Sequence, residues 1–264
     1  MKKQFERNHA GILVFLTIGL LGILWMLPPI SQDKHYHNFA DSNSFLGIPN
    51  FMNVVSNIPF ILIGIIGLIK IAKIDQPEFP KMAMLFFFGG VLLTGFGSAY
   101  YHWHPDNHSL LWDRLPMTIT FMSLFSAIVS LHMEEWSGKM LLFPLLIIGI
   151  GSVLYWYITE LKGQGDLRPY VFVQFYPMLI IPLIMFLYPV KGTAIKILLP
   201  MIGFYAVAKY FEYGDESLYS LGHLMSGHTL KHLFAALATV SMLNIEKIYQ
   251  LKFKNIRENG ATSL

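Results

Sequence analysis

Residues 98–114 read SAYYHWHPDNHSLLWDR. They end one strongly apolar segment and begin the next, with a short polar turn between the two. A helix needs about 20 apolar residues to cross the hydrocarbon core of a bilayer, and segments of that length flank the turn on both sides. The stretch therefore predicts two consecutive membrane helices. It also gathers histidines and an aspartate at their shared end, where ionisable groups are costly to keep without a function.

The whole chain has the composition of an integral membrane protein. Of its 264 residues, 54% are hydrophobic and 13% are charged, whereas an ordinary soluble domain has about 25% charged residues. The net charge of +3 is too small to indicate nucleic acid as a partner, and nothing in the sequence implies a protein partner. There is no cysteine, so any metal ion must be held by nitrogen and oxygen ligands.

Eight apolar segments are predicted to be membrane-spanning helices, because a chain that crosses a bilayer must satisfy its backbone polar groups within each segment. The fold class predicted is an all-α, polytopic membrane helix bundle. The first segment resembles a signal peptide, but its apolar run is long and lacks a small-residue cleavage pattern, so we expect an uncleaved span. The segments cover approximately residues 10–30, 52–72, 82–102, 110–131, 139–159, 169–189, 194–212 and 224–244.

Lysine and arginine flank these segments asymmetrically. Placing the N-terminus in the cytoplasm puts most of them on the cytoplasmic side, as the positive-inside rule requires, and the C-terminus then lies there too. We expect a multi-pass protein of the cell (inner) membrane. Eight of the ten histidines fall on the opposite side, although histidine played no part in the assignment. These eight are His35, His37, His102, His104, His108, His223, His228 and His232.

Two polar pairs have the spacing that places both members on one helix face. Ser98 and His102 lie near the outer end of the third segment, and His228 and His232 lie near the outer end of the eighth. Two imidazoles at positions i and i+4 can hold one metal ion. A third ligand from another helix would leave a fourth position open for water, as in catalytic zinc sites. Asp113, on the same side, could orient a ligand or handle protons.

Other polar residues have more ordinary interpretations. His104 lies in what we interpret as a solvated turn, and pairing with Arg114 is an alternative role for Asp113. Charged clusters occur within residues 166–174 and 209–216, near the outer ends of two spans. Either cluster could line a head-group pocket, but we expect interfacial clusters with aromatic anchors.

The motifs taken together resemble the CREST superfamily of membrane hydrolases, whose pattern is S-x-x-x-H, an aspartate in the next span, and H-x-x-x-H in the last. GSAYYH and WDRLPM are similar to motifs of its alkaline ceramidases, and IPNFMNVVSN (residues 48–57) resembles the opening of their core. The resemblance implies a seven-helix membrane domain in residues 35–246. Residues 1–34 would add an N-terminal tail and an extra transmembrane helix, and residues 247–264 a cytoplasmic tail.

The resemblance further implies a zinc-dependent amide hydrolase that takes ceramide or another N-acyl lipid from the bilayer and releases a fatty acid. Ser98 and Asp113 would be the catalytic residues. Calcium dependence is not expected, because Asn50 stands where the family has a calcium-binding glutamate and calcium prefers several hard oxygen ligands. The zinc ligands would be His102, His228 and His232.

Two other classes of function remain open. One is a receptor or sensor with a structural zinc site, which a fourth protein ligand such as Asp113 or His104 would close. The other is a haem-binding electron carrier, which the pattern disfavours because an i, i+4 pair points both rings the same way.

Overall fold

The computed structural model describes residues 2–76, 79–190 and 194–250, and over that part of the chain it is an all-α bundle. The predicted fold class is confirmed. The bundle comprises α1 (Lys2–Met26), η1 (Lys34–His37, a 3₁₀ helix), α2 (Phe51–Val55), α3 (Ile58–Ala72), α4 (Lys81–Trp103), α5 (Asn107–His132), α6 (Glu135–Leu161), α7 (Arg168–Leu187), α8 (Ala194–Tyr213), α9 (Asp215–Tyr219), α10 (Gly227–Val240) and η2 (Ser241–Asn244, 3₁₀).

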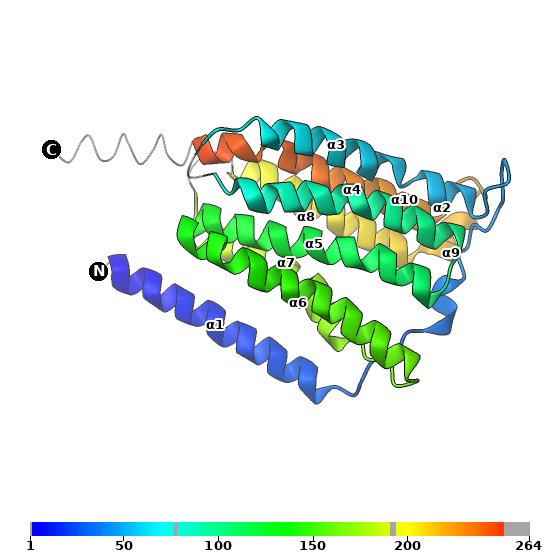
Figure 1. Cartoon of the computed structure of the whole chain (residues 1–264), viewed down its shortest axis with the longest axis horizontal. Coiled ribbons are helices and arrows are strands. Elements are labelled where there is room, and N and C mark those ends of the chain that lie inside the picture. Colours follow the sequence, from blue (N-terminus) through cyan, green and yellow to red (C-terminus); the bar gives the residue numbers. More distant parts are fainter. Residues whose placement is uncertain (1, 77–78, 191–193, 251–264) are drawn as a thin grey trace.

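The long helices run side by side along the length of the bundle (Figure 1). The beginning of α1 and the last described helical residues lie at the same end. This arrangement agrees with the prediction that both termini lie on one side of a membrane. Which side is cytoplasmic stays a prediction.

Six helices in the described part of the chain are long and apolar enough to cross a membrane: α1, the α2–α3 pair, α4, α5, α6 and α7. The chain is therefore a multi-pass membrane protein. The remaining two predicted spans correspond to α8 and to α10 with η2, which also run along the bundle (Figure 1). Because α10 itself has only 14 residues, a crossing by these last two helices stays a prediction.

The predicted span 52–72 is broken at Ser56 and Asn57, between α2 and α3. Pro59 causes the break, because it has no N–H with which to continue the helical hydrogen bonding. The Asn57 N–H bonds to the Val54 carbonyl instead of the Asn53 carbonyl. The freed Asn53 carbonyl accepts the Ser56 hydroxyl at 3.0 Å and the Asn57 amide at 2.8 Å.

Two other helix ends differ from the prediction for local reasons. α1 ends at Met26 rather than near residue 30, because the residue before a proline avoids the helical conformation and prolines follow at 28 and 29. α5 begins at Asn107 rather than 110. Asp106 accepts the Ser109 N–H at 2.6 Å and the Ser109 hydroxyl accepts the Asp106 N–H, so a capping box starts the helix inside the polar turn.

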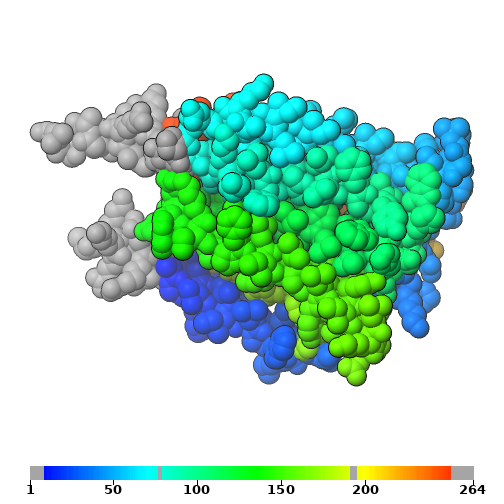
Figure 2. Space-filling model, viewed as in Figure 1, coloured from blue at the N-terminus to red at the C-terminus, as the bar shows by residue number. Residues whose placement is uncertain are grey.

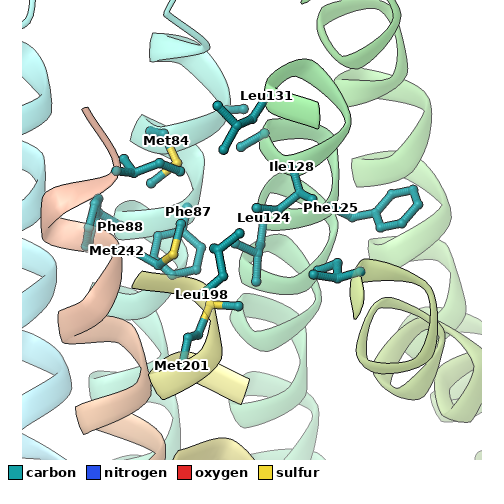
Figure 3. Close-up of a cluster of buried hydrophobic side chains, with 14 of the residues drawn as sticks. Met84, Phe87, Phe88, Leu124, Phe125, Ile128, Leu131, Leu198, Met201 and Met242 are labelled. Atoms are coloured by element: carbon teal, nitrogen blue, oxygen red, sulfur yellow. The ribbon is translucent and has the colours of Figure 1, made fainter. Parts of the chain in front are cut away.

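A tightly packed apolar cluster fills the bundle toward the end where the described chain begins and ends. Met84 and Phe88 of α4 pack there with Ile128 of α5, Leu198 of α8 and Met242 of η2 (Figure 3). Residues 245–250 continue the helical path, and Ile248 and Tyr249 are fully buried, beyond the predicted start of the tail at residue 247. Residues 251–264 of that predicted tail lie outside the described part. The apolar cluster leaves the polar side chains gathered at the opposite end.

Candidate metal centre

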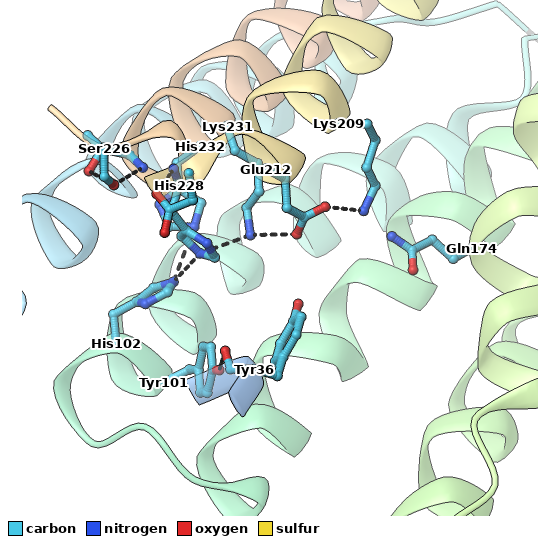
Figure 4. A network of polar contacts seen from close by, with 12 residues as sticks. Tyr36, Tyr101, His102, Gln174, Lys209, Glu212, Ser226, His228, Lys231 and His232 are labelled. Atoms are coloured by element: carbon cyan, nitrogen blue, oxygen red, sulfur yellow. Dashed lines mark hydrogen bonds and ion pairs between the residues drawn. The ribbon is translucent and has the colours of Figure 1, made fainter. Parts of the chain in front are cut away.

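Three buried histidines from two helices converge at the end of the bundle opposite the termini (Figure 4). The Nε2 atom of His102 lies 3.2 Å from that of His232 and 3.3 Å from that of His228. Nitrogens bound tetrahedrally to zinc at about 2.0–2.1 Å lie roughly 3.3–3.4 Å apart. The ligating nitrogens of all three lie within 4.8 Å of one another. The group could therefore hold a metal ion, and its donor set suits Zn²⁺.

No fourth histidine or carboxylate joins this group among the residues that the structure describes. His104, the loop alternative, is exposed at the end of α4. His108 is also exposed, and its ring lies 3.0 Å from the Tyr157 hydroxyl. His37 contacts the Tyr101 hydroxyl at 3.0 Å. These rings are exposed or make other contacts, and the three histidines that the structure brings together are those that the family resemblance names.

The start of α10 is held so that its histidines face α4. Ser226 caps the helix by accepting the Thr229 N–H, and Asp215 of α9 accepts the His228 N–H at 2.7 Å. Gly227 permits close packing: a Cβ at this position would lie 2.2 Å from the Phe211 carbonyl oxygen. His228 therefore lies in the first turn of α10, where the hydrogen bond from its backbone N–H to Asp215 holds it in place.

The hydrogen bonding of His232 leaves one ring nitrogen free to bind a metal. Its Nδ1 lies 2.8 Å from the Ser56 hydroxyl oxygen. Ser56 uses its own hydroxyl proton for the Asn53 carbonyl, so the Ser56 oxygen must accept a proton from His232 Nδ1. Nε2 then carries the bare lone pair. Outer contacts of this kind commonly orient metal-binding histidines.

His102 is enclosed at the end of α4. The Phe39 ring packs against it at 4.6 Å between ring centroids and against His228 at 5.0 Å. Asn50, which stands where the resemblance would place a calcium-binding glutamate, donates its side-chain amide to the His102 carbonyl at 2.9 Å. Its role here is thus to hold the backbone of a candidate ligand.

Ser98 and Asp113 come together where α4 and α5 approach most closely. A Cβ on Gly97 would lie 2.1 Å from the Trp112 carbonyl oxygen, so only glycine allows this approach. Both side chains are buried. Arg114 points elsewhere: it donates to Gln32 at 2.8 Å. Asp113 is thereby placed beside Ser98, in the second turn of α5.

A chain of charged side chains extends from the histidines into the bundle (Figure 4). Lys231 donates to His228 Nε2 at 3.0 Å and to Glu212 at 3.2 Å, and Lys209 donates to Glu212 at 2.6 Å. Because one lone pair binds one partner, a metal ion on His228 would displace the Lys231 ammonium toward Glu212. A lysine between two histidines of one helix is the sequence signal for this network, although the motifs alone predicted no role for Lys231.

Two members of the charged cluster at residues 209–216 line a cavity, and the position of the cluster at the membrane interface stays a prediction. Lys209 and Glu212 line a cavity of about 200 Å³, here called the polar chamber, together with Asp113, Arg114 and Lys231. An apolar cavity of about 130 Å³ adjoins it, and three residues line both: Met117, Tyr205 and Ala235. Asp113 and Lys231 thus border a space that changes from charged to apolar.

Comparison with known protein families gives one match. The family model described as Ceramidase matches residues 44–200, which is more than half of the chain. The matched segment contains Ser98, His102 and Asp113 but ends before α10, so His228 and His232 join the site through the fold. No curated protein matches the sequence closely enough to be reported as similar.

Proposed function

The chain belongs to the ceramidase family of membrane amide hydrolases, and we propose that it cleaves the amide bond of ceramide or another N-acyl lipid with zinc bound by His102, His228 and His232. The products would be a free fatty acid and an amine. The observation that carries the zinc assignment is the convergence of three buried imidazoles, in which the Nε2 atom of His102 lies 3.2 Å from that of His232 and 3.3 Å from that of His228, spacings that suit tetrahedral coordination.

Zinc in such a site would polarise a carbonyl and activate water for attack. The lack of a fourth ligand in the described part of the chain supports an open, catalytic site over the closed site of a receptor. The buried surroundings of the three rings favour neutral imidazole, which is the form that binds metal.

Asp113 is proposed to accept the proton of the attacking water and to pass it to the departing amine nitrogen. Ser98 is proposed to hold the Asp113 carboxylate or to donate to the oxygen of the reacting carbonyl. The apolar cavity suits the acyl chain, because it is lined by side chains such as Phe60, Val91 and Leu124. These roles explain why the ionisable groups lie at the end of a membrane bundle.

Paired measurements of metal content and fatty-acid release test this proposal. Purified wild-type protein should contain one zinc per chain, and chelation should abolish release of fatty acid from a panel of N-acyl lipids. Each single change to alanine at His102, His228 or His232 should remove metal and activity. His104→Ala is the matched control and should keep both. Full metal occupancy in all three variants would refute the ligand set.

The placement in the membrane is a second part of the proposal. The three histidines lie at the end of the bundle opposite the beginning of α1 (Figure 1). With both termini cytoplasmic, the site would face the extracytoplasmic side, in the seven-helix domain of residues 35–246, and α1 would be an addition to that domain. Reporter fusions after residues 105 and 264 should report opposite sides of the membrane. The same side for both would refute the topology.

A further inference from the structure

The polar chamber holds more positive than negative side chains. Its charged lining consists of Arg114, Lys209 and Lys231 against Asp113 and Glu212. A charge that is removed from water without a compensating partner is costly, so a cavity with excess positive charge favours an anion. A zinc ion on the neighbouring histidines would add to this excess. An uncharged lipid head group would not require this excess of positive charge in the polar chamber.

The excess of one positive charge lies with the two lysines, because both bond to the single carboxylate of Glu212. Lys209 lies 2.6 Å and Lys231 3.2 Å from its two carboxylate oxygens (Figure 4). The Arg114 guanidinium and the Asp113 carboxylate balance each other in charge, but Arg114 donates to Gln32 rather than to Asp113. Glu212 thus accepts hydrogen bonds from two cations, while Arg114 still has an N–H donor that can bind another group.

Arg114 has an unused donor in a buried position. The residue is only 5% exposed, and its Nη2 donates to Gln32 while its Nη1 is buried without a hydrogen-bond partner among the described residues. Aromatic rings surround the guanidinium, with the ring centroids of Trp156 at 4.3 Å and Tyr170 at 4.8 Å. Rings stabilise a cation but do not accept an in-plane N–H as an anion does. A carboxylate or phosphate oxygen would complete this arrangement.

We infer that the substrates of this protein are N-acyl lipids whose head group carries an anion, and that Arg114 recognises it. This inference rests on the proposed function and narrows its substrate class. The acyl chain would occupy the apolar cavity, which shares Met117, Tyr205 and Ala235 with the chamber. The amide would lie beside Asp113 and the histidines, and the anion would lie at Arg114. Carboxylates and phosphates share this chemistry.

Matched substrates test the inference in neutral detergent. N-oleoylglycine and N-oleoylethanolamine carry the same chain and differ in the anionic group, and ceramide 1-phosphate and ceramide form a second pair. Wild type should show a higher kcat/KM for the anionic member of at least one pair, and the pair that responds identifies carboxylate or phosphate as the anion. Equal or lower values for both anionic members would overturn the inference.

Variants of Arg114 separate recognition from folding. Arg114→Gln should lower the ratio of anionic to neutral kcat/KM by roughly 10- to 100-fold, since hydrogen bonds to charged groups have energies in that range. Arg114→Lys should keep part of the preference for anionic substrates, because lysine keeps the positive charge but lacks the planar pair of donors that a guanidinium offers. Lys162→Gln, which removes an exposed charge from the end of α6, is the matched control and should change nothing. An equal loss on both substrates in Arg114→Gln would show a merely structural role.

A binding measurement distinguishes failure of this inference from failure of the proposed function. In the presence of chelator, N-oleoylglycine or ceramide 1-phosphate should raise the melting temperature of wild type more than its neutral counterpart, and Arg114→Gln should lose that difference. If no lipid is cleaved but this difference appears, the hydrolase proposal fails and the anion site stands. If neutral and anionic lipids bind and react alike, the anion site fails alone.

Discussion

The helices α5 and α1 are both apolar enough to cross a membrane, but they occupy opposite environments. In their most apolar windows, 67% of the α5 residues and 6% of the α1 residues are buried inside the protein. The mean hydropathy of the α1 window is nevertheless the higher of the two. α1 lies along the edge of the bundle (Figure 2) and contacts α7. α5 packs against α4, α6 and α7.

The comparison shows that hydropathy in a membrane protein reports exposure to lipid rather than burial in the core. Lipid accepts Phe15 and Ile18 of α1 as readily as a protein interior would, so the helix needs few partners. α5 instead carries Asp113 and Arg114, ionisable side chains that are costly to expose to lipid. The less apolar helix is the one that builds the core and the site.

The largest expected difference between the two helices concerns catalysis. Asp113→Asn on α5 keeps the size of the side chain but cannot accept a proton, so amide hydrolysis should fall roughly 10²–10⁴-fold while zinc content stays unchanged. Fatty-acid release and metal analysis on the same preparation measure both. Thr17→Val on α1 should leave activity at the wild-type level. A loss of zinc together with Asp113 would instead favour the closed, structural site.

The next largest difference between α5 and α1 should be in how much the packing of their side chains contributes to stability. Ile128 of α5 is fully buried and Ile18 of α1 is 64% exposed. Ile128→Ala should lower the free energy of unfolding by about 2–5 kcal/mol, because it leaves a cavity in the core. Ile18→Ala exchanges one lipid contact for another and should have almost no effect. Thermal unfolding in one detergent compares the two, and equal destabilisation would contradict the peripheral placement of α1.

The loop that ties α1 to the bundle should respond to acid. Arg168 donates to the Leu27 carbonyl at 2.7 Å and bonds to Asp166 at 2.8 Å, and hydrogen bonds from Arg168 hold the pKa of Asp166 below its usual range. The stabilisation is therefore present above the unfolded pKa of about 4 and is lost as the pH falls through the lower folded value. Asp166→Asn should lower the melting temperature at neutral pH by less than Ile128→Ala, and its difference from wild type should vanish in acid. A difference that persisted unchanged at pH 2 would refute this coupling.

The smallest effect belongs to a single polar contact of α1. The Thr17 and Tyr176 hydroxyls lie 2.8 Å apart between α1 and α7. Hydrogen bonds between membrane helices contribute about 0.6 kcal/mol on average, so Thr17→Val should reduce stability by about that amount. Tyr176→Phe removes the same bond and should match it in a double-mutant cycle. A much larger value would mean that this contact anchors α1.

Local patterns explain what the sequence predicted. Long apolar runs predict helices because the bilayer leaves no other solution for the backbone, and helical spacing places His228 and His232 on one face. The expectation that His102 lies close to His228 and His232 came from the family resemblance, whose motifs lie in separate spans. The structure then brought the three nitrogens together, although the family match ends before α10.

Contacts between distant segments escaped prediction. The Ser56–His232 bond joins residues 176 positions apart, and it depends on the break that Pro59 imposes. Lys209 and Glu212 were expected at the membrane interface, because charge near a span end usually lies there, and that placement stays a prediction. The bond from Lys231 to Glu212 and the cavity that they line were not predicted. Their inward direction depends on how α8 packs against α10, which no local pattern encodes.

The interruption between α2 and α3 links backbone shape to proton position. Ser56 can accept from His232 only because its own hydroxyl turns back to the Asn53 carbonyl, and that carbonyl is available only while the helix is broken. Straightening the helix would return the carbonyl to the Asn57 N–H and free the serine proton to point at the ring. The His232 imidazole would then favour the tautomer that carries its hydrogen on Nε2, the nitrogen that would bind a metal. A proline two residues from the gap thereby governs the chemistry of a histidine on another helix.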